Sequence, residues 1–189
     1  MRPIALMFAA LTVLAGAGQA QAQFFDSRGY QSEAPSFFGN RASPIPRATV
    51  NYPTDYAPGT IVVNTAERRL YLVQANGQAL RYGIGVGRDG FRWSGTHRIT
   101  AKKEWPAWTP PSQMLRRRPD LPRHMAGGIE NPLGARAMYL GSTLYRIHGS
   151  NEPETIGQAV SSGCFRMTND DVKDLYDRVS VGTTVVVKN

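Results

Sequence analysis

The sequence predicts a mainly β domain with one amphipathic helix near its C-terminus. From residue 59 onward, short runs of β-branched and aromatic residues alternate with turn residues, a pattern typical of short strands. Residues 167–182 show the apolar spacing of a helix that buries one face. Residues 105–135 are rich in proline and glycine and lack periodicity, so they predict a long functional loop or lid.

The first 22 residues have the features of a secretory signal peptide. Arg2 gives a positive start, residues 4–14 form a short apolar run, and residues 20–22 (Ala-Gln-Ala) form a small-residue cleavage site. A membrane-spanning helix needs about 20 apolar residues, so cleavage is favoured over the alternative of an uncleaved N-terminal anchor. We therefore expect export to the periplasm, with no transmembrane segment after cleavage.

Residues 23–57 differ in composition from the rest of the chain. They are rich in Pro, Ser, Gly and Asn and show no sustained periodicity, so they predict a flexible leader or tether. The remaining stretch, residues 58–189, is long enough for one folded domain.

The chain is basic, with 22 Lys and Arg against 14 Asp and Glu and a formal net charge of +8. The charges of the leader cancel, so the excess lies in residues 58–189 and is densest in the Arg-Arg-Arg run at 116–118. A basic surface suits nucleic acid or another anionic polymer; for an exported protein we expect an envelope polymer and no nucleic acid. A surface that is basic only for solubility is an equal alternative.

The predicted strands follow one another through recognisable turns. A turn at Ala66 and Glu67 joins the first two, and Asn76-Gly77, the strongest short hairpin signal, joins the second to the third. The predicted strands cover residues 60–64, 68–74, 79–87, 95–105, 136–141, 143–149 and 183–188.

The predicted helix has its own start and stop signals. Thr168 is the expected N-cap, Asp170 and Asp171 lie in the first turn where the helix dipole favours acids, and Gly182 is the expected C-terminal stop. The acids are therefore interpreted as capping residues and not as a catalytic pair. The apolar face consists of Val172, Leu175, Tyr176 and Val179.

Cys164 is the single cysteine of the chain, so no internal disulfide is possible. In an exported protein a lone cysteine is an intermolecular partner, a reactive thiol or a buried inert thiol. The three histidines, at positions 97, 124 and 148, show no metal-ligand spacing, so we expect no metal site.

The surroundings of Cys164 favour a nucleophile. A thiol attacks as its thiolate and needs a base, which His148, at the end of a predicted strand and followed by Gly149, can supply. The backbone amides of Gly163 and Cys164 are candidate oxyanion donors. Arg166 shares a face with Cys164 in extended backbone, where it can hold a substrate carboxylate or favour the thiolate. A satisfied strand-end histidine and a surface ion pair remain the alternatives for His148 and Arg166.

The segment "IHGS" (147–150), followed by "SSGCFRM" (161–167), resembles the signature of the YkuD-type L,D-transpeptidase catalytic domain. The resemblance covers residues 58–189 and implies a β-sandwich of mixed sheets with the C-terminal helix packed on it. It also implies Cys164 as nucleophile, His148 as general base, and the Gly149 carbonyl as the group that orients the imidazole. The family pattern often has a second His before Gly-Cys, where this chain has Ser162, so no role of that His carries over.

The resemblance implies a substrate and a reaction. The thiolate would attack peptidoglycan stem tetrapeptides at the third residue, commonly meso-diaminopimelate, release D-alanine and pass the acyl group to an amine. That amine belongs to another stem, an envelope protein or a D-amino acid, and no cofactor is needed. A same-fold hydrolase and a catalytically silent wall-binding module are the alternatives. The expected substrate-binding residues are Arg166, Ser161, Trp105 and Trp108.

Overall fold

The structure, a computed structural model, describes residues 42–189, so the predicted signal peptide and most of the predicted leader lie outside the described residues. The helices are α1 (Ser112–Arg117) and α2 (Asn169–Arg178), with a short 3-10 turn at Pro153–Thr155. The strands are β1 (Ala48–Asn51), β2 (Ile61–Asn64), β3 (Arg69–Val73), β4 (Gln78–Gly83), β5 (Val86–Gly87), β6 (Gly95–Glu104), β7 (Arg136–Leu140), β8 (Arg146–His148), β9 (Ala159–Ser161), β10 (Phe165–Arg166) and β11 (Thr184–Lys188).

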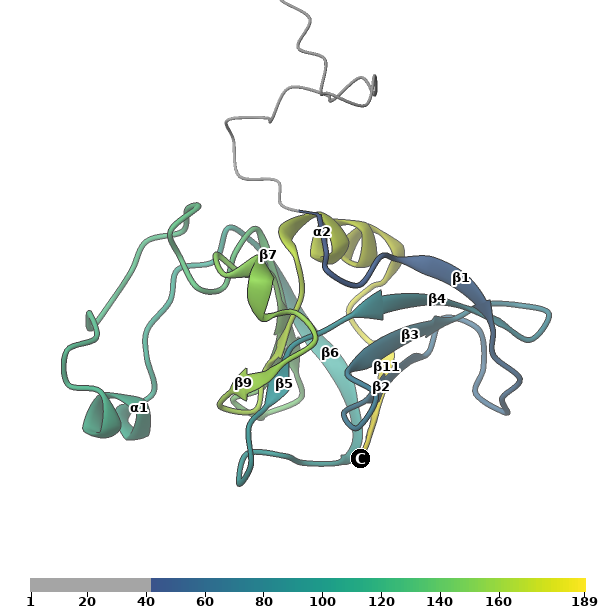
Figure 1. The fold of residues 1–189 in the computed structure, drawn as a ribbon, viewed down its shortest axis with the longest axis horizontal. Helices are drawn as coiled ribbons and strands as arrows, with labels where there is room; N and C mark the ends of the chain where they lie inside the picture. The colour runs from purple at the N-terminus through teal and green to yellow at the C-terminus, as the bar shows by residue number, and fades with distance from the viewer. Residues whose placement is uncertain (1–41) are drawn as a thin grey trace, which may run out of the picture. The chain divides into compact units, whose positions relative to one another are not determined.

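Most of the strands form one mixed sheet of nine strands, in the order β1-β4-β3-β2-β11-β6-β7-β8-β10, beside the two-stranded pair β5-β9. Strand β6 joins two parts of the large sheet: Gly95 to Arg98 pair with β11, whereas Ile99 to Glu104 pair with β7. The two parts lie on either side of β6 (Figure 1). The predicted mainly β fold of mixed sheets with a C-terminal helix is confirmed, and its two layers are parts of one continuous sheet.

The hydrophobic core lies between these parts and α2. Leu70 and Tyr82 come from the first part, Met138 and Phe165 from the second, and Leu175 from the helix, and all five side chains are buried. Burial of a large apolar side chain contributes roughly 1.5–3 kcal/mol. The strands are therefore held together by contacts between segments that are distant in the sequence.

Helix α2 begins as predicted and ends earlier than predicted. The Thr168 hydroxyl accepts a hydrogen bond from the Asp171 N–H at 3.2 Å, which confirms the N-cap. The helix ends at Arg178, so the prediction of a stop at Gly182 was wrong. The reason is Lys102 of β6, whose Nζ donates to the carbonyls of Tyr176 and Val179, each at 2.6 Å. A side chain from the sheet thus replaces the expected glycine cap.

The end of the predicted leader is part of the folded sheet. Strand β1 pairs antiparallel with β4, and Arg47, just before it, forms ion pairs with Asp171 and Asp174 of α2 at 3.6 and 3.1 Å. The structure therefore differs from the expectation of a flexible segment up to residue 57. Strand β1 covers what would otherwise be an exposed edge of β4, a benefit that its own short sequence does not reveal.

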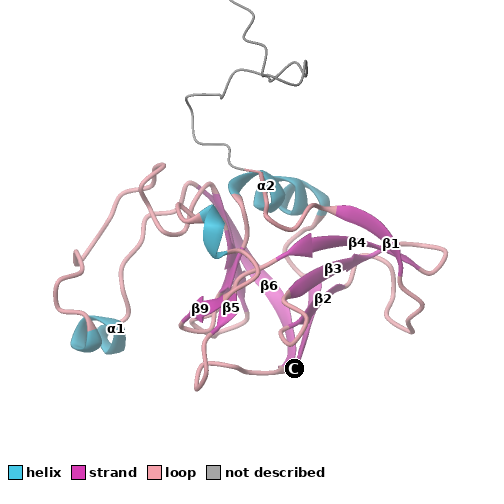
Figure 2. Cartoon of the chain, viewed as in Figure 1, coloured by secondary structure: helices cyan, strands magenta, loops and turns pink. Residues whose placement is uncertain are grey.

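The predicted hairpin turn is confirmed, whereas the single strand predicted over residues 79–87 is divided between β4 and β5, which belong to different sheets. Asn76 and Gly77 have φ of 59° and 66° in the turn between β3 and β4, as a tight hairpin requires. The 105–135 segment, here called the lid segment, is mostly loop but contains α1, which the sequence did not predict (Figure 2). Across residues 42–189 no helix has the length and apolar character needed to cross a membrane.

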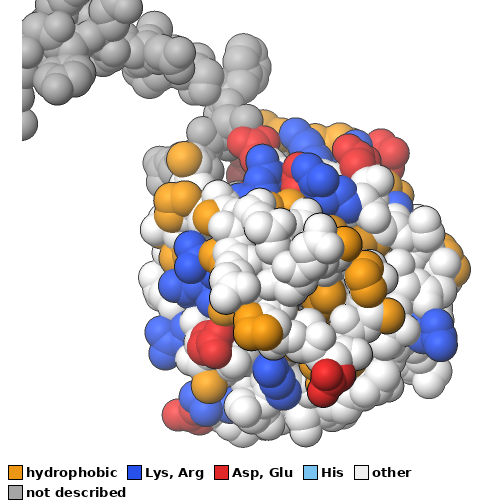
Figure 3. All heavy atoms as spheres, turned by 90° about the vertical axis from the view of Figure 1, so that its right-hand side faces the viewer, with side chains coloured by type: hydrophobic (Ala, Val, Ile, Leu, Met, Phe, Trp, Pro, Cys, Tyr) orange, Lys and Arg blue, Asp and Glu red, His pale blue; other side chains and the backbone are white. Residues whose placement is uncertain are grey.

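The face beside the β1–β4 edge carries basic and acidic side chains in mixture, without a large patch of one sign (Figure 3). The net positive charge is therefore not concentrated on this face. The arginines that matter for the site lie elsewhere, in a groove beside Cys164.

Candidate active site

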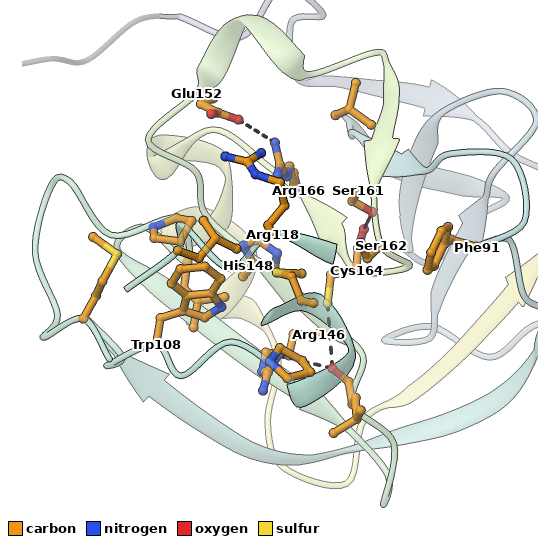
Figure 4. Close-up of a pocket in the computed structure, with 18 of the residues that line it drawn as sticks. Phe91, Trp108, Arg118, Arg146, His148, Glu152, Ser161, Ser162, Cys164 and Arg166 are labelled. Atoms are coloured by element: carbon orange, nitrogen blue, oxygen red, sulfur yellow. Dashed lines mark hydrogen bonds and ion pairs between the residues drawn. The ribbon is translucent and has the colours of Figure 1, made fainter. Parts of the chain in front are cut away.

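A groove of about 1020 Å³ lies between the lid segment and the strands that carry Cys164 and His148 (Figure 4). Strand β8 ends at His148, and β10 begins directly after Cys164. Both candidate catalytic residues line this groove, so the fold brings together two positions that are separated in the sequence.

The strand register explains why these side chains share one face. Strands β8 and β10 are parallel, with Ile147 opposite Phe165 and His148 opposite Arg166. Ile147 and Phe165 are buried in the core. Because side chains alternate along a strand, their neighbours point to the other face, which is the groove. The polar set formed in this way consists of Arg146, His148, Cys164 and Arg166.

His148 is held in one tautomer. Its Nδ1 lies 2.6 Å from the Gly149 carbonyl oxygen, and since a carbonyl only accepts, Nδ1 carries the proton. The unprotonated Nε2 is then free to act as a base. Burial, with a smaller contribution from the charge of Arg166, lowers the pKa of His148 to about 3. The imidazole is therefore neutral at neutral pH.

Gly149 is required for steric reasons. A Cβ at this position would lie 2.3 Å from Oδ1 of Asn169, the first residue of α2. That oxygen also accepts the N–H of Ala135 at 2.8 Å, so it is fixed in place. The start of α2 therefore supports the carbonyl that orients His148. The sequence analysis missed Asn169, and no local pattern in the sequence indicates it.

The nucleophile loop, residues 161–164, is organised by Ser161. The Ser161 hydroxyl donates to the Cys164 carbonyl at 2.6 Å and accepts the Gly163 N–H at 3.1 Å. The Gly163 amide is thus engaged by Ser161 in this geometry, and its role as an oxyanion donor stays a prediction. Among residues 42–189 the Cys164 N–H has no protein acceptor, which leaves this amide for an oxyanion.

Two aromatic side chains clamp the same loop. A Cβ on Gly163, whose φ is +109°, would lie 2.4 Å from the Tyr145 ring. Trp93 stacks on Tyr145 with ring centroids 4.4 Å apart, and its Nε1 donates to the Gly163 carbonyl at 2.7 Å. The sequence analysis missed Trp93 and Tyr145, because both are distant from Cys164 along the chain.

The Cys164 thiol is partly buried and donates to the Leu144 carbonyl at 3.8 Å. Burial raises its pKa, and the neighbouring Arg146 acts in the opposite direction. Nη1 of Arg146 donates to the same Leu144 carbonyl at 3.2 Å, as Figure 4 shows. Arg146 was not among the predicted site residues, although it stands two positions before His148 and so shares its strand face.

The predicted substrate-binding residues are placed differently. Trp108 lines the groove, whereas Trp105 is absent from the groove lining and is 40% exposed. Arg166 lines the groove and donates to Glu152 at 2.7 Å, so the ion-pair alternative describes its resting contact. Ser161 also lines the groove, but its hydroxyl is used within the nucleophile loop.

The lid segment is closed at its base. Trp108 and Met125 exchange two backbone hydrogen bonds of 2.8 Å, and α1 lies in the excursion between them. The buried Asn131 side chain donates to the Ala126 carbonyl at 2.8 Å and accepts the Leu133 N–H at 2.9 Å. In the part of the chain that the structure describes, no three His, Cys, Asp or Glu side chains gather as metal ligands would.

Comparison with known proteins shows which family the chain belongs to. A family model of the YkuD L,D-transpeptidase catalytic domain matches residues 58–187. The chain belongs to this family. Probable L,D-transpeptidase ErfK/SrfK of Escherichia coli (strain K12) is 41% identical over 136 residues, which cover 67% of this chain and 43% of that protein. The chain thus spans less than half the length of this L,D-transpeptidase relative.

Solved structures give the same fold. An L,D-transpeptidase from Mycobacterium smegmatis is 19% identical with a TM-score of 0.57, covering 70% of this chain and 59% of that chain. A Brucella melitensis structure, described as a probable carnitine operon oxidoreductase, is 49% identical with a TM-score of 0.51. It covers 75% of this chain and 92% of that chain.

Proposed function

We propose that this domain is a peptidoglycan L,D-transpeptidase with Cys164 as nucleophile and His148 as general base. The observation that carries the proposal is the 2.6 Å contact of His148 Nδ1 with the Gly149 carbonyl, which leaves Nε2 as the base. Cys164 lies just before the strand paired with that of His148, and both side chains line one groove. Membership of the L,D-transpeptidase family supports the same chemistry.

The proposed reaction has two halves. In the first, Nε2 of His148 takes the Sγ proton of Cys164, and the thiolate attacks the carbonyl carbon of the third residue of a stem tetrapeptide. The C–N bond to D-alanine breaks, the leaving amine takes the proton from the imidazolium, and a thioester remains on Cys164. In the second half, His148 deprotonates an acceptor amine, which attacks the thioester, forms the new amide and releases the thiol.

The resting pKa values oppose proton transfer before attack, so the proton moves from Cys164 to His148 as the thiol attacks. Burial raises the pKa of Cys164 and lowers the pKa of His148, so thiol and imidazole are both neutral before substrate binds. The free N–H of Cys164 is the oxyanion donor in this proposal, and Arg146 stabilises the developing negative charge. Trp108 and Arg166 are the proposed substrate contacts, and Ser161 positions the nucleophile loop.

Mass spectrometry of the protein after incubation with stem tetrapeptides tests this proposal. The wild type should gain the mass of an acyl group with loss of D-alanine, and Cys164→Ala should gain none while keeping its circular dichroism spectrum. His148→Ala should acylate more slowly by a factor of about 10² to 10⁴. Full turnover by Cys164→Ala would overturn the mechanism.

Product analysis separates the transferase from the hydrolase alternative. With a second tetrapeptide or a D-amino acid as acceptor, a transferase yields cross-linked or exchanged stems, and a hydrolase yields free tripeptide. Tripeptide as the main product at every acceptor concentration would establish the hydrolase. The alternative that an envelope protein is the acceptor is tested in the same assay, with a peptide that carries a free amine as the acceptor.

The cellular location belongs to the same proposal. We infer a periplasmic protein from the N-terminal signal, cleaved after residue 22, and a tether formed by the part of the leader that precedes Arg47 and β1. The mass of the mature protein recovered from the periplasm gives the cleavage site. Recovery only from the cytoplasm, with Met1 retained, would contradict the inference.

A further inference from the structure

We propose that Arg88 and Arg117 form a carboxylate-binding subsite that anchors the peptide substrate in the groove. The identity of the peptide rests on the proposed function, whereas the subsite rests on its own geometry. Neither arginine belongs to the family signature of His148 and Cys164. They come from two segments, the loop after β5 and the end of α1.

The two guanidinium groups each lie over the same aromatic ring. Cζ of Arg88 lies 4.4 Å from the centroid of the Phe91 ring, and Cζ of Arg117 lies 5.1 Å from the same centroid. All three residues line the groove that holds Cys164. The contact joins the lid segment to the loop after β5, so the subsite exists only when α1 is in this position.

Arg88 is tied directly to the nucleophile loop. Its backbone N–H donates to the Ser161 carbonyl at 3.1 Å, and its Nη1 donates to the Ser162 hydroxyl at 3.5 Å. A ligand held by Arg88 is therefore adjacent to the loop that presents Cys164. This places the subsite along the path of a peptide whose reacting carbonyl reaches the thiol.

Two other arginines of the groove have carboxylate partners, whereas Arg146, which lies beside Cys164, has none among residues 42–189. Arg118 makes a two-point pair with Asp120 at 2.9 and 2.6 Å, and Arg166 pairs with Glu152 at 2.7 Å. Each of these guanidinium groups is thus neutralised within the protein. They contrast with Arg88 and Arg117.

Within residues 42–189, neither Arg88 nor Arg117 has an acidic partner. The acid next to Arg88 in the chain, Asp89, pairs with Arg92 at 3.2 Å instead. Two positive groups at one ring repel each other, and the attraction of each to the Phe91 face only partly offsets this. A carboxylate bound between them would remove the repulsion and accept hydrogen bonds from both forks.

The Arg116–Arg118 run of the sequence thereby acquires distinct roles. Arg117 reaches Phe91, Arg118 binds Asp120, and Arg116 is exposed and absent from the groove lining. Arg116 is therefore a matched control: the same side chain on the same helix with the same charge.

The ligand is a peptide with a free carboxylate besides that of the leaving D-alanine. The experiment uses a tetrapeptide stem and a set of analogues. In each analogue, one carboxylate other than that of the leaving D-alanine is replaced by a carboxamide. Binding is measured by calorimetry on Cys164→Ala, which cannot turn over, and acylation is measured on proteins that retain Cys164. Transfer is measured separately by varying the acceptor, which distinguishes a donor carboxylate from an acceptor carboxylate.

One carboxamide should weaken binding about tenfold, the size expected for one lost charge-assisted contact. Arg88→Gln and Arg117→Gln should each weaken binding of the acid similarly and abolish the difference between acid and amide, with KM changing more than kcat. Arg116→Gln should leave unchanged both the binding of the acid and the difference in binding between acid and amide. Equal binding of every amide, or full discrimination in both variants, would overturn the subsite. Acylation by none of the peptides, with discrimination in binding intact, would instead reject the proposed function alone.

Discussion

The resting charges of Cys164 and His148 depend on single neighbouring residues. The Gly149 carbonyl fixes the imidazole proton on Nδ1, and burial keeps the ring neutral. Arg146 is the main group that lowers the pKa of the Cys164 thiol against the opposing effect of burial. Two substitutions at this scale therefore have separable consequences, because one acts on the thiol and the other on the base.

Replacement of Arg146 should raise the pKa of Cys164 further. In Arg146→Gln the positive charge beside the thiol is lost while a polar side chain is kept, so the thiolate becomes less favourable. The pH profile of Cys164 alkylation should move to higher pH, and acylation by peptide should slow. Arg98→Gln, on an exposed arginine outside the groove, is the control. An alkylation profile identical to that of wild type would show that Arg146 does not act on the thiol.

Replacement of Gly149 by alanine should displace the base. The new Cβ would stand 2.3 Å from Asn169 Oδ1, so the carbonyl that holds His148 must move. Because small misplacements of a catalytic group cost about 10²-fold in rate, we expect acylation to fall by about that factor. Gly128→Ala, where a Cβ meets nothing within 4 Å, should be silent. Equal rates in the two variants would mean that Gly149 does not position His148.

At the scale of elements, the lid segment and the nucleophile loop wall the groove from opposite sides. The lid segment is anchored at its base by the Trp108–Met125 bridge and at α1 by the contact of Arg117 with Phe91. The nucleophile loop is fixed by Ser161 and by the Trp93–Tyr145 stack. A groove walled on two sides in this way limits the access of water to the thioester. An acceptor amine can compete for the thioester only where water is partly shut out.

Loss of the Trp108 side chain should favour hydrolysis over transfer. Trp108→Ala keeps the backbone bridge to Met125 but opens the groove wall, so water reaches the thioester more easily. The ratio of cross-linked stems to free tripeptide should fall several-fold. The effect on acylation of Cys164 should be smaller. Trp105→Ala, outside the groove lining, should leave the ratio unchanged. A similar fall in both variants would assign the effect to the fold of the lid segment.

At the scale of the whole molecule, the candidate active site borders the core that stabilises the fold. Ile147 and Phe165 pack in the core, while their strand neighbours His148 and Cys164 form the site. Helix α2 packs against β7 and its first residue supports Gly149, so folding of the helix and assembly of the site are coupled. Stability and activity should therefore respond together to acid.

Acid should destabilise the fold through His148. Its pKa is about 3 in the folded protein and 6.5 when unfolded, so between these values the unfolded chain binds more protons. The contribution is fully present above pH 6.5 and is lost as pH falls toward 3, at about 1.4 kcal/mol per pH unit within that window. The contribution of His148 is measured by comparing the free energies of denaturant unfolding of wild type and His148→Gln at pH 7, 6 and 5. Equal pH slopes for both proteins would contradict the assignment.

Local signals in the sequence were sufficient for several features. The Asn76-Gly77 turn, the Thr168 cap and the apolar face of α2 depend on the backbone sterics and periodicity of a few neighbouring residues. The resemblance of the segments around His148 and Cys164 to the family signature also predicted the family and the fold. These features depend on residues close together in the chain, and a sequence displays such patterns directly.

Tertiary structure decided the features that join distant segments. It added β1 to the sheet, ended α2 through Lys102, engaged the Gly163 amide and excluded Trp105 from the groove. It also brought Arg88 and Arg117 to one ring. These contacts join segments far apart in the chain, and their geometry follows from how the sheet packs around its core. No local pattern encodes that packing, so the sequence by itself predicted the residues of the candidate site, and only the fold determined which partners surround them.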